Sequence, residues 1–252
     1  MISYYYVNPT GNITLLIDSP VPPQKKAETA KALMLAEPDA EQVGFIDGKN
    51  LNMAGGEFCG NATLSAAAVY CLKNGLEKAE IDMTVSGAES PVRVRIEKTG
   101  DGIYSGEVEM PAPESIDEIE LTLDGKKINV PLVNFGSISH IILTEKADIE
   151  ECERVIGGLC KKLDAGGLGI MLVDGDKLTP LVYVPEPETL VRESSCASGT
   201  TAAGIYFASL SGGAYEKEFT EPGGTLGISL IPGKPPLLRG SVEIKGLFDS
   251  KN

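Results

Sequence analysis

The stretch Glu57-Phe58-Cys59-Gly60-Asn61-Ala62-Thr63 decides how the chain is understood, because Glu193-Ser194-Ser195-Cys196-Ala197-Ser198-Gly199-Thr200-Thr201 repeats its pattern. In both stretches a cysteine is followed by small residues and then by a mostly apolar run. The first run, GNATLSAAAVYCLKNG, ends at Gly75, and the second, ASGTTAAGIYFASLSG, ends at Gly212. Runs with so little polar face predict two buried helices.

Local residues indicate where each helix begins and ends. We expect Asn61 or Thr63 to cap the first helix, and Ser198 or Thr200 to cap the second. The glycine at the end of each run suits a helix C-terminus, where a residue in the left-handed conformation is common. Each cysteine then lies just before a helix N-terminus, where unpaired N–H groups and the helix dipole favour negative charge.

That placement gives each cysteine two chemical uses. It lowers the pKa of the thiol, which makes the thiolate a usable base. It also creates an anion site for a substrate carboxylate. The expected N–H donors and close-approach positions at the two motifs are Gly60, Asn61, Ala197, Ser198 and Gly199. Two such sites on opposite sides of one carbon are what a two-base racemase needs, although a lone buried cysteine is more commonly an inert small hydrophobe.

The chain resembles the diaminopimelate epimerase-like superfamily of cofactor-independent racemases and epimerases. Cys-Gly-Asn at Cys59 is similar to the first catalytic motif of that superfamily, and Cys-Ala-Ser-Gly-Thr at Cys196 is similar to the second. The resemblance implies that Cys59 and Cys196 are the catalytic pair and that no pyridoxal phosphate or other cofactor is used. It further implies that Asn12 and Asn50 contact the substrate.

Glutamates precede both cysteines, Glu57 before Cys59 and Glu193 before Cys196. A carboxylate so close to a thiol could accept its proton, bind an ammonium group or oppose thiolate formation by repulsion. We therefore regard both as auxiliary candidates, with solvated surface glutamates as the alternative. His140, the single histidine, is more simply explained as a strand residue bonded to a backbone partner than as a catalytic base.

The resemblance is weakest where a substrate side chain would bind. Diaminopimelate epimerases carry an arginine eight residues before the second cysteine, and here that position is Glu188. The pattern is more similar to amino-acid racemases such as the histidine racemases, so histidine or another basic or neutral amino acid is favoured. Two alternatives stay open: a diaminopimelate epimerase with an altered distal pocket, and a noncatalytic carboxylate-binding protein on the same scaffold.

The elements around the motifs predict an α+β protein. Periodicity predicts helices at 24–35 and 149–163 and strands at 81–85, 92–96, 104–110, 119–123, 127–133 and 170–173. The resemblance implies two pseudo-symmetric domains, each a curved, mostly antiparallel sheet wrapped around a central buried helix. Pro111-Ala112-Pro113 suggests domains 1–112 and 113–240. The resemblance implies that the final strand, in 241–252, returns to the first domain.

The composition of the chain limits the kinds of binding partner that we expect. The net charge of −14 argues against nucleic acid and anionic membranes. Five cysteines and one histidine offer no metal-ligand spacing, and the odd number does not suggest a disulfide framework. We expect a cytoplasmic enzyme with an amino-acid substrate, no metal, and a homodimer as one option for its assembly.

Overall fold

The structure is a computed structural model that describes residues 2–186 and 188–250. Its chain forms two compact units. Unit 1 comprises the residues up to Glu109 together with those from Leu238 onward, and unit 2 runs from Met110 to Leu237. The chain therefore leaves unit 1 once and re-enters it with its last strand.

Unit 1 is a closed barrel of eight strands, counted over its described residues. Their order is β1 (Ser3–Pro9), β2 (Thr14–Ile17), β3 (Gln42–Asp47), β4 (Asn50–Met53), β5 (Lys78–Val85), β6 (Val92–Gly100), β7 (Ile103–Glu109) and β16 (Leu237–Asp249). Closure comes from the antiparallel pairing of β16 with β1. The return of the chain to this unit thus completes the barrel and removes its open edges.

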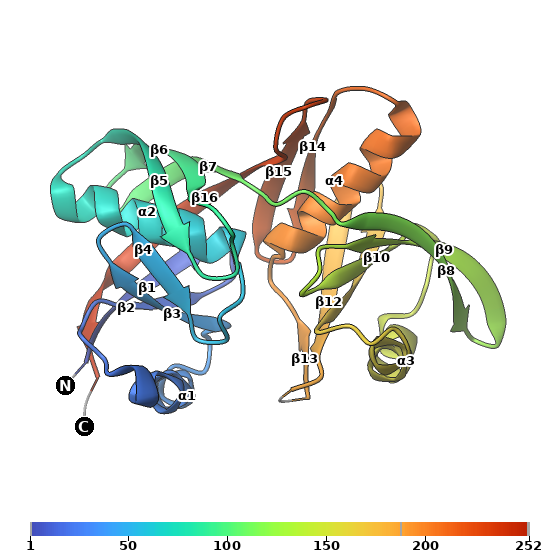
Figure 1. Ribbon diagram of the computed structural model, residues 1–252, viewed down its shortest axis with the longest axis horizontal. Helices are drawn as coiled ribbons and strands as arrows, with labels where there is room; N and C mark the ends of the chain where they lie inside the picture. The colour runs from blue at the N-terminus through green and yellow to red at the C-terminus, as the bar shows by residue number, and fades with distance from the viewer. Residues whose placement is uncertain (1, 187, 251–252) are drawn as a thin grey trace. The chain divides into compact units, whose positions relative to one another are not determined.

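Helix α2 (Gly60–Asn74) lies within this barrel and packs against β1, β2, β5, β6 and β7 (Figure 1). Small residues form much of its surface, and Ala62, Ala66, Ala67 and Ala68 are at most 2% exposed. Because alanine side chains are short, strands can approach the helix from several sides. A second helix, α1 (Lys26–Ala36), follows the short 3-10 turn η1 (Pro23–Lys25) and packs against β3.

Unit 2 is a sheet with helices on both faces. Its strand order is β15 (Gly224–Leu230), β14 (Tyr215–Glu221), β12 (Lys177–Val184), β11 (Leu168–Asp174), β10 (Ser139–Leu143), β9 (Lys126–Asn134) and β8 (Ser115–Leu123), with β13 (Thr189–Arg192) also paired to β12. Successive residues of a strand point to opposite faces. Ile141 packs in the core beneath α3 (Ile149–Lys162), and Ile142 packs in the core beneath α4 (Ala197–Ser211).

The two cysteine-bearing helices both occupy crossover connections. β4 pairs in parallel with β5, and α2 is the segment that joins them. β12 pairs in parallel with β14, and α4 lies in the segment between them. Parallel neighbours require such a crossover, usually a helix. The motifs thus stand at the same point of the chain path in each unit, immediately before the crossover helix.

The expected mixture of helices and strands is confirmed, with some local differences. The helix predicted at 149–163 is α3, and the helix predicted at 24–35 begins instead as a 3-10 turn at Pro23. Strands β4, β13 and β14 were not predicted. Asn50–Met53 is short and half polar, Thr189–Arg192 is exposed throughout, and Tyr215–Glu221 is rich in charged residues. Their edge or half-exposed positions remove the apolar pattern on which strand prediction depends.

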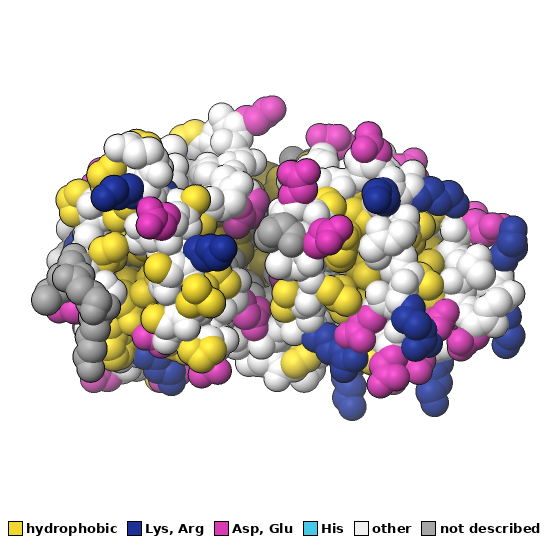
Figure 2. Space-filling model, turned by 90° about the horizontal axis from the view of Figure 1, so that it is seen from below, with side chains coloured by type: hydrophobic (Ala, Val, Ile, Leu, Met, Phe, Trp, Pro, Cys, Tyr) yellow, Lys and Arg dark blue, Asp and Glu magenta, His cyan; other side chains and the backbone are white. Residues whose placement is uncertain are grey.

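The charged side chains of the surface are mixed in sign. Figure 2 shows Lys and Arg side chains interspersed with Asp and Glu over the face that it displays. The net charge of −14 is therefore not a uniform acidic coat on that face. Among the described residues no helix has both the length and the apolar character to span a bilayer.

Candidate active site

Cys59 is itself the N-cap of α2, which corrects the expectation that Asn61 or Thr63 would cap this helix. Its backbone is extended (φ −134°, ψ 115°), and its Sγ accepts a hydrogen bond from the Ala62 N–H at 3.5 Å. The Thr63 hydroxyl instead donates back to the Cys59 carbonyl at 2.7 Å. The sulfur therefore lies over the first turn, where the positive end of the helix dipole stabilises negative charge.

A network of hydrogen-bonded side chains connects Cys59 to strands of the barrel. The Cys59 thiol donates to Oε1 of Gln42 at 3.1 Å, and Nε2 of Gln42 donates to Asn12 at 2.5 Å and to Thr14 at 2.7 Å. Asn12 in turn donates to Glu41. With both amide hydrogens of Gln42 engaged, its carbonyl oxygen is directed at the thiol. No sequence pattern pointed to Gln42, because a glutamine at the start of a strand can serve many purposes.

The loop before Cys59 is fixed by the residues that follow β5. The Ser86 hydroxyl donates to the Glu57 carbonyl at 2.9 Å and accepts from the Met53 N–H at 2.9 Å. Gly87 has a positive φ of 74°, and a Cβ there would lie 2.2 Å from the Phe58 nitrogen. The close approach that glycine permits holds the loop in place.

Cys196 is the N-cap of α4 and repeats this geometry. Its φ and ψ are −128° and 104°, and its Sγ accepts from the Gly199 N–H at 3.4 Å. We expected Ser198 or Thr200 to cap this helix, and the Cys196 sulfur does so instead. Gly199 is packed tightly, since a Cβ would lie 2.1 Å from Sδ of Met171. Both helices end as predicted, with Gly75 and Gly212 in the left-handed conformation.

Two carboxyl groups surround Cys196, and one was not anticipated. Glu221, at the end of β14, accepts the Cys196 N–H at 2.7 Å and the Thr200 hydroxyl. It is 4% exposed, and burial raises its pKa to about 8 against the opposing effect of those two bonds. Burial, followed by the charge and hydrogen bond of Glu193, raises the pKa of the Cys196 thiol well above its ordinary value. This corrects the expectation that its place before the helix would lower the pKa of Cys196, which is therefore a thiol near neutral pH.

His140 lies behind this motif, on β10. It is fully buried, and its Nε2 is 2.9 Å from the Ser198 hydroxyl. Burial lowers the pKa of His140 to about 3, so the ring is neutral. Its Nδ1 has no hydrogen-bond partner among the described residues. An orphaned acceptor costs less than an orphaned donor, which favours the tautomer that donates from Nε2 to Ser198. The partner is thus a side chain and not the backbone group that we expected.

Of the other residues predicted for the site, Asn12 lies in the Cys59 network and Asn50 lies away from it. Asn12 is 5% exposed and belongs to the Gln42 network. Asn50 pairs with Asp47 in the turn at the opposite end of β3 from Gln42, and its amide donates to the Asp47 carbonyl. At about 3.3 Å per residue, β3 separates the two ends by roughly 15 Å. The structure does not bring Asn50 to Cys59, so its role in substrate binding stays a prediction. Glu57 is exposed, and Glu193 is half-buried.

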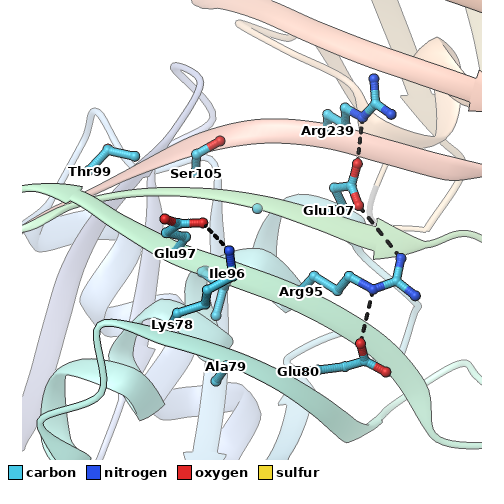
Figure 3. A pocket seen from close by; sticks show the side chains of 11 residues that line it. Lys78, Ala79, Glu80, Arg95, Ile96, Glu97, Thr99, Ser105, Glu107 and Arg239 are labelled. Atoms are coloured by element: carbon cyan, nitrogen blue, oxygen red, sulfur yellow. Dashed lines mark hydrogen bonds and ion pairs between the residues drawn. The ribbon is translucent and has the colours of Figure 1, made fainter.

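Unit 1 also has a hollow away from its cysteine motif. One, of about 690 Å³, lies over β5, β6, β7 and β16 and is lined by charged side chains (Figure 3). Arg239 pairs with Glu107 at 2.6 Å, Glu107 with Arg95 at 3.6 Å, and Arg95 with Glu80 at 3.0 Å. Because these charges neutralise one another, we regard this face as a solvated ladder of ion pairs. No cluster of three or more metal-ligating side chains occurs among the described residues.

Solved structures share this fold. A predicted epimerase from Pseudomonas aeruginosa superimposes with a TM-score of 0.73 at 14% identity, with full coverage of both chains. A PhzF-family phenazine biosynthesis protein from Enterococcus faecalis gives 0.64 at 14% identity, covering 100% of this chain and 99% of that one. At such identities the likeness establishes the fold. The sequence relatives given next place the chain among the cofactor-independent racemases and epimerases.

Sequence relatives define the family more narrowly. Residues 1–239 match the family model of the histidine racemase CntK N-terminal domain, and the chain belongs to that family. A histidine racemase from Fusobacterium nucleatum subsp. nucleatum (strain ATCC 23726) is 38% identical over 217 residues, which is 82% of this chain and 81% of that protein. One from Staphylococcus aureus (strain Mu50) is 29% identical, over 82% and 80% respectively. The protein is therefore an isomerase, an amino-acid racemase.

Proposed function

We propose that this protein is a histidine racemase that inverts the α-carbon with Cys59 and Cys196 as its two acid–base groups. The observation that carries the proposal is that both cysteines are N-caps with nearly the same backbone angles, each with its sulfur over the first turn of a buried crossover helix. Packing alone does not require a cysteine at both positions. A noncatalytic carboxylate-binding protein would need the helix termini but not the thiols.

The carboxylate of the amino acid would be held by first-turn N–H groups. We assign Gly60 and Asn61 of α2, and Ala197 and Ser198 of α4, to this role. Loss of the α-proton moves negative charge onto the carboxylate, so donors fixed before the reaction stabilise the transition state more than the substrate. This is the main source of stabilisation available to an enzyme that lacks a cofactor to delocalise the charge.

The protonation states suggest how one half-reaction begins. Cys196 starts as a thiol, because burial and Glu193 disfavour its thiolate. Cys59 would then be the base, and its partial exposure lets it exchange its proton with water. The α-C–H bond breaks as its proton passes to the Cys59 sulfur, and its electron pair moves toward the carboxylate. Cys196 gives its proton to the other face of the α-carbon. The next turnover in the reverse direction restores both groups.

Histidine is favoured as substrate by the relatives and by the charges near Cys196. The relatives described above are themselves histidine racemases. Glu188 stands where a diaminopimelate epimerase would have the arginine for the distal carboxylate, and the nearby Arg192 is bound to Glu153 of α3 at 2.6 Å. A ring with a neutral or positive charge is more compatible with these surroundings than a second carboxylate.

The test is proton NMR of the reduced enzyme in D₂O with L-histidine, L-lysine, L-arginine, L-alanine and diaminopimelate in separate samples. Loss of the α-proton signal for histidine, followed by formation of D-histidine on chiral chromatography, is the expected result. If only diaminopimelate lost its α-proton signal, the substrate would be diaminopimelate and not histidine. If histidine bound without losing its α-proton while both thiols were reduced, the protein would be a carboxylate-binding protein and not an enzyme.

A further inference from the structure

Glu221 is a buried carboxyl group that the proposed proton transfer does not use. It ends β14, the strand that follows α4, and it is 4% exposed. One oxygen accepts the Cys196 N–H at 2.7 Å, and the other accepts the Thr200 hydroxyl. Both partners belong to the first turn of α4 and its N-cap. Glu221 therefore contacts the cysteine backbone from another element of the same unit.

These contacts replace a local helix cap that α4 cannot make. In a capping box the side chain at N3 accepts the N–H of the N-cap residue. In α4 the N3 residue is Gly199, and the contact with Met171 leaves no space for a Cβ. The N-cap N–H of Cys196 must then be satisfied from outside the helix, because a buried N–H without a partner is unfavourable. Glu221 supplies the acceptor that a capping-box glutamate would supply.

The loop before the cysteine of unit 1 is held by a different kind of group. In unit 1 the residue that follows β5 is Ser86, whose hydroxyl donates to the Glu57 carbonyl in the loop before Cys59. A neutral hydroxyl thus fixes the loop there, whereas an ionisable group fixes the turn at Cys196. The titratable groups that face Glu221 are Glu193, from the loop before α4, and the Cys196 thiol. Burial raises the pKa of Glu221 to about 8.

We propose that Glu221 is a positioning residue for proton transfer at Cys196. Its carboxyl group fixes the N-cap backbone, and so the direction of the thiol, and when it ionises it opposes a thiolate on Cys196. Because Glu221 reaches the backbone and Thr200, it acts through the cysteine. This inference rests on the proposed function for its kinetic consequence, but its electrostatic consequence can be measured without substrate.

The variants are Glu221→Gln, which keeps a hydrogen-bonding group and removes the charge, and Glu221→Leu, which removes both. Glu218→Gln is the matched control, because Glu218 lies on the exposed side of the same strand. For each protein, the ultraviolet absorbance of thiolate is titrated against pH with and without Cys196→Ser. The difference isolates Cys196. Racemisation of histidine is measured in parallel for kcat and KM.

We expect Glu221→Gln to lower the pKa of Cys196 by about half a unit to one unit, a three- to tenfold change in thiolate at a given pH. Glu218→Gln is expected to leave it unchanged. Glu221→Leu should lower kcat roughly 10- to 100-fold with KM nearly constant, as for a misplaced catalytic group. Glu221→Gln should keep most of the activity at neutral pH. A Cys196 titration identical in wild type and Glu221→Gln would overturn the electrostatic role, and wild-type kcat in Glu221→Leu would overturn the positioning role.

Glu221→Asp keeps the test decisive if the other variants do not fold. It keeps the charge but is too short to reach both partners, so kcat should fall while the pKa of Cys196 stays high. An ordinary thiol pKa in that variant would contradict the inference. Failure of the proposed function has a different signature: the wild type would not racemise histidine, while Cys196 would still respond to Glu221→Gln.

Discussion

The thiol of Cys59 donates a hydrogen bond to the side-chain carbonyl of Gln42, 3.1 Å away. Gln42 cannot easily rotate its amide, because its nitrogen already donates to Asn12 and Thr14. The catalytic candidate of unit 1 thus faces a neutral acceptor, whereas Cys196 faces two glutamates. The two thiols are alike in backbone geometry, and they differ in these side-chain neighbours. A racemase that begins with one thiol and one thiolate can use this difference.

Replacing Gln42 with glutamate tests the importance of the neutral acceptor. A carboxylate beside the sulfur opposes the thiolate and raises the pKa of Cys59. We expect Gln42→Glu to shift the pH profile of Cys59 alkylation upward and to lower kcat at least about tenfold at neutral pH. Mass-spectrometric mapping reports each cysteine separately, so Cys196 serves as an internal control. An unshifted Cys59 profile would mean that the Gln42 contact does not influence the thiol.

Removing either thiol should stop inversion. We expect Cys59→Ser and Cys196→Ser each to reduce racemisation of histidine by about 10²- to 10⁴-fold, since a serine hydroxyl is a far weaker acid and base in this range. Cys71→Ala is the matched control, because Cys71 is buried on the same helix as Cys59 but outside the motif. It should keep its activity. Either serine variant inverting histidine at the wild-type rate would rule out the two-thiol mechanism.

Adding one methyl group at Gly199 should disturb the N-cap of α4. A Cβ there would lie 2.1 Å from Sδ of Met171 and 3.2 Å from the Cys196 sulfur. We expect Gly199→Ala to reduce the free energy of unfolding by about 1–3 kcal/mol and to lower kcat. Gly158→Ala is the control, since a Cβ on that exposed helical glycine meets nothing within 4 Å. It should stabilise the protein by up to about 1 kcal/mol. Urea unfolding measures both, and equal effects would contradict the close contact.

His140 should make stability depend on pH in mildly acidic solution. Its pKa is about 3 when folded, below the unfolded value of about 6.5. The unfolded state therefore binds the proton more readily, and stability is lost as pH falls through 6.5 toward 3. His140 contributes about 1.4 kcal/mol per pH unit to this slope, and Glu221, whose folded pKa is about 8, contributes in the opposite direction. Because His140 is the single histidine, His140→Gln should change the slope of unfolding free energy against pH by about 1.4 kcal/mol per pH unit between about 6.5 and 4.5. The same slope in both proteins would show that His140 is not buried as a neutral ring.

The sequence by itself determined the two helices that the cysteine motifs precede. The repeated cysteine and the small apolar runs behind it predicted α2 and α4, and glycine at Gly75 and Gly212 predicted their ends. These features are local: helix periodicity and the left-handed glycine depend on neighbours along the chain. The matched family and relatives agree with the class of enzyme that the same motifs indicated.

Only the tertiary structure decided which groups surround each sulfur. Cys59 meets Gln42 from β3, and Cys196 meets Glu221 from β14, partners that lie well away in sequence and carry no motif. The sequence also assigned the N-caps to serine, threonine or asparagine, because it could not reveal that the sulfur itself accepts the first-turn N–H. Hydrogen bonds and burial depend on which strands pack beside the helix ends, and these are set by the parallel crossovers. The chain thus encodes two cysteine-capped helix starts locally, and the fold decides which side chains contact them.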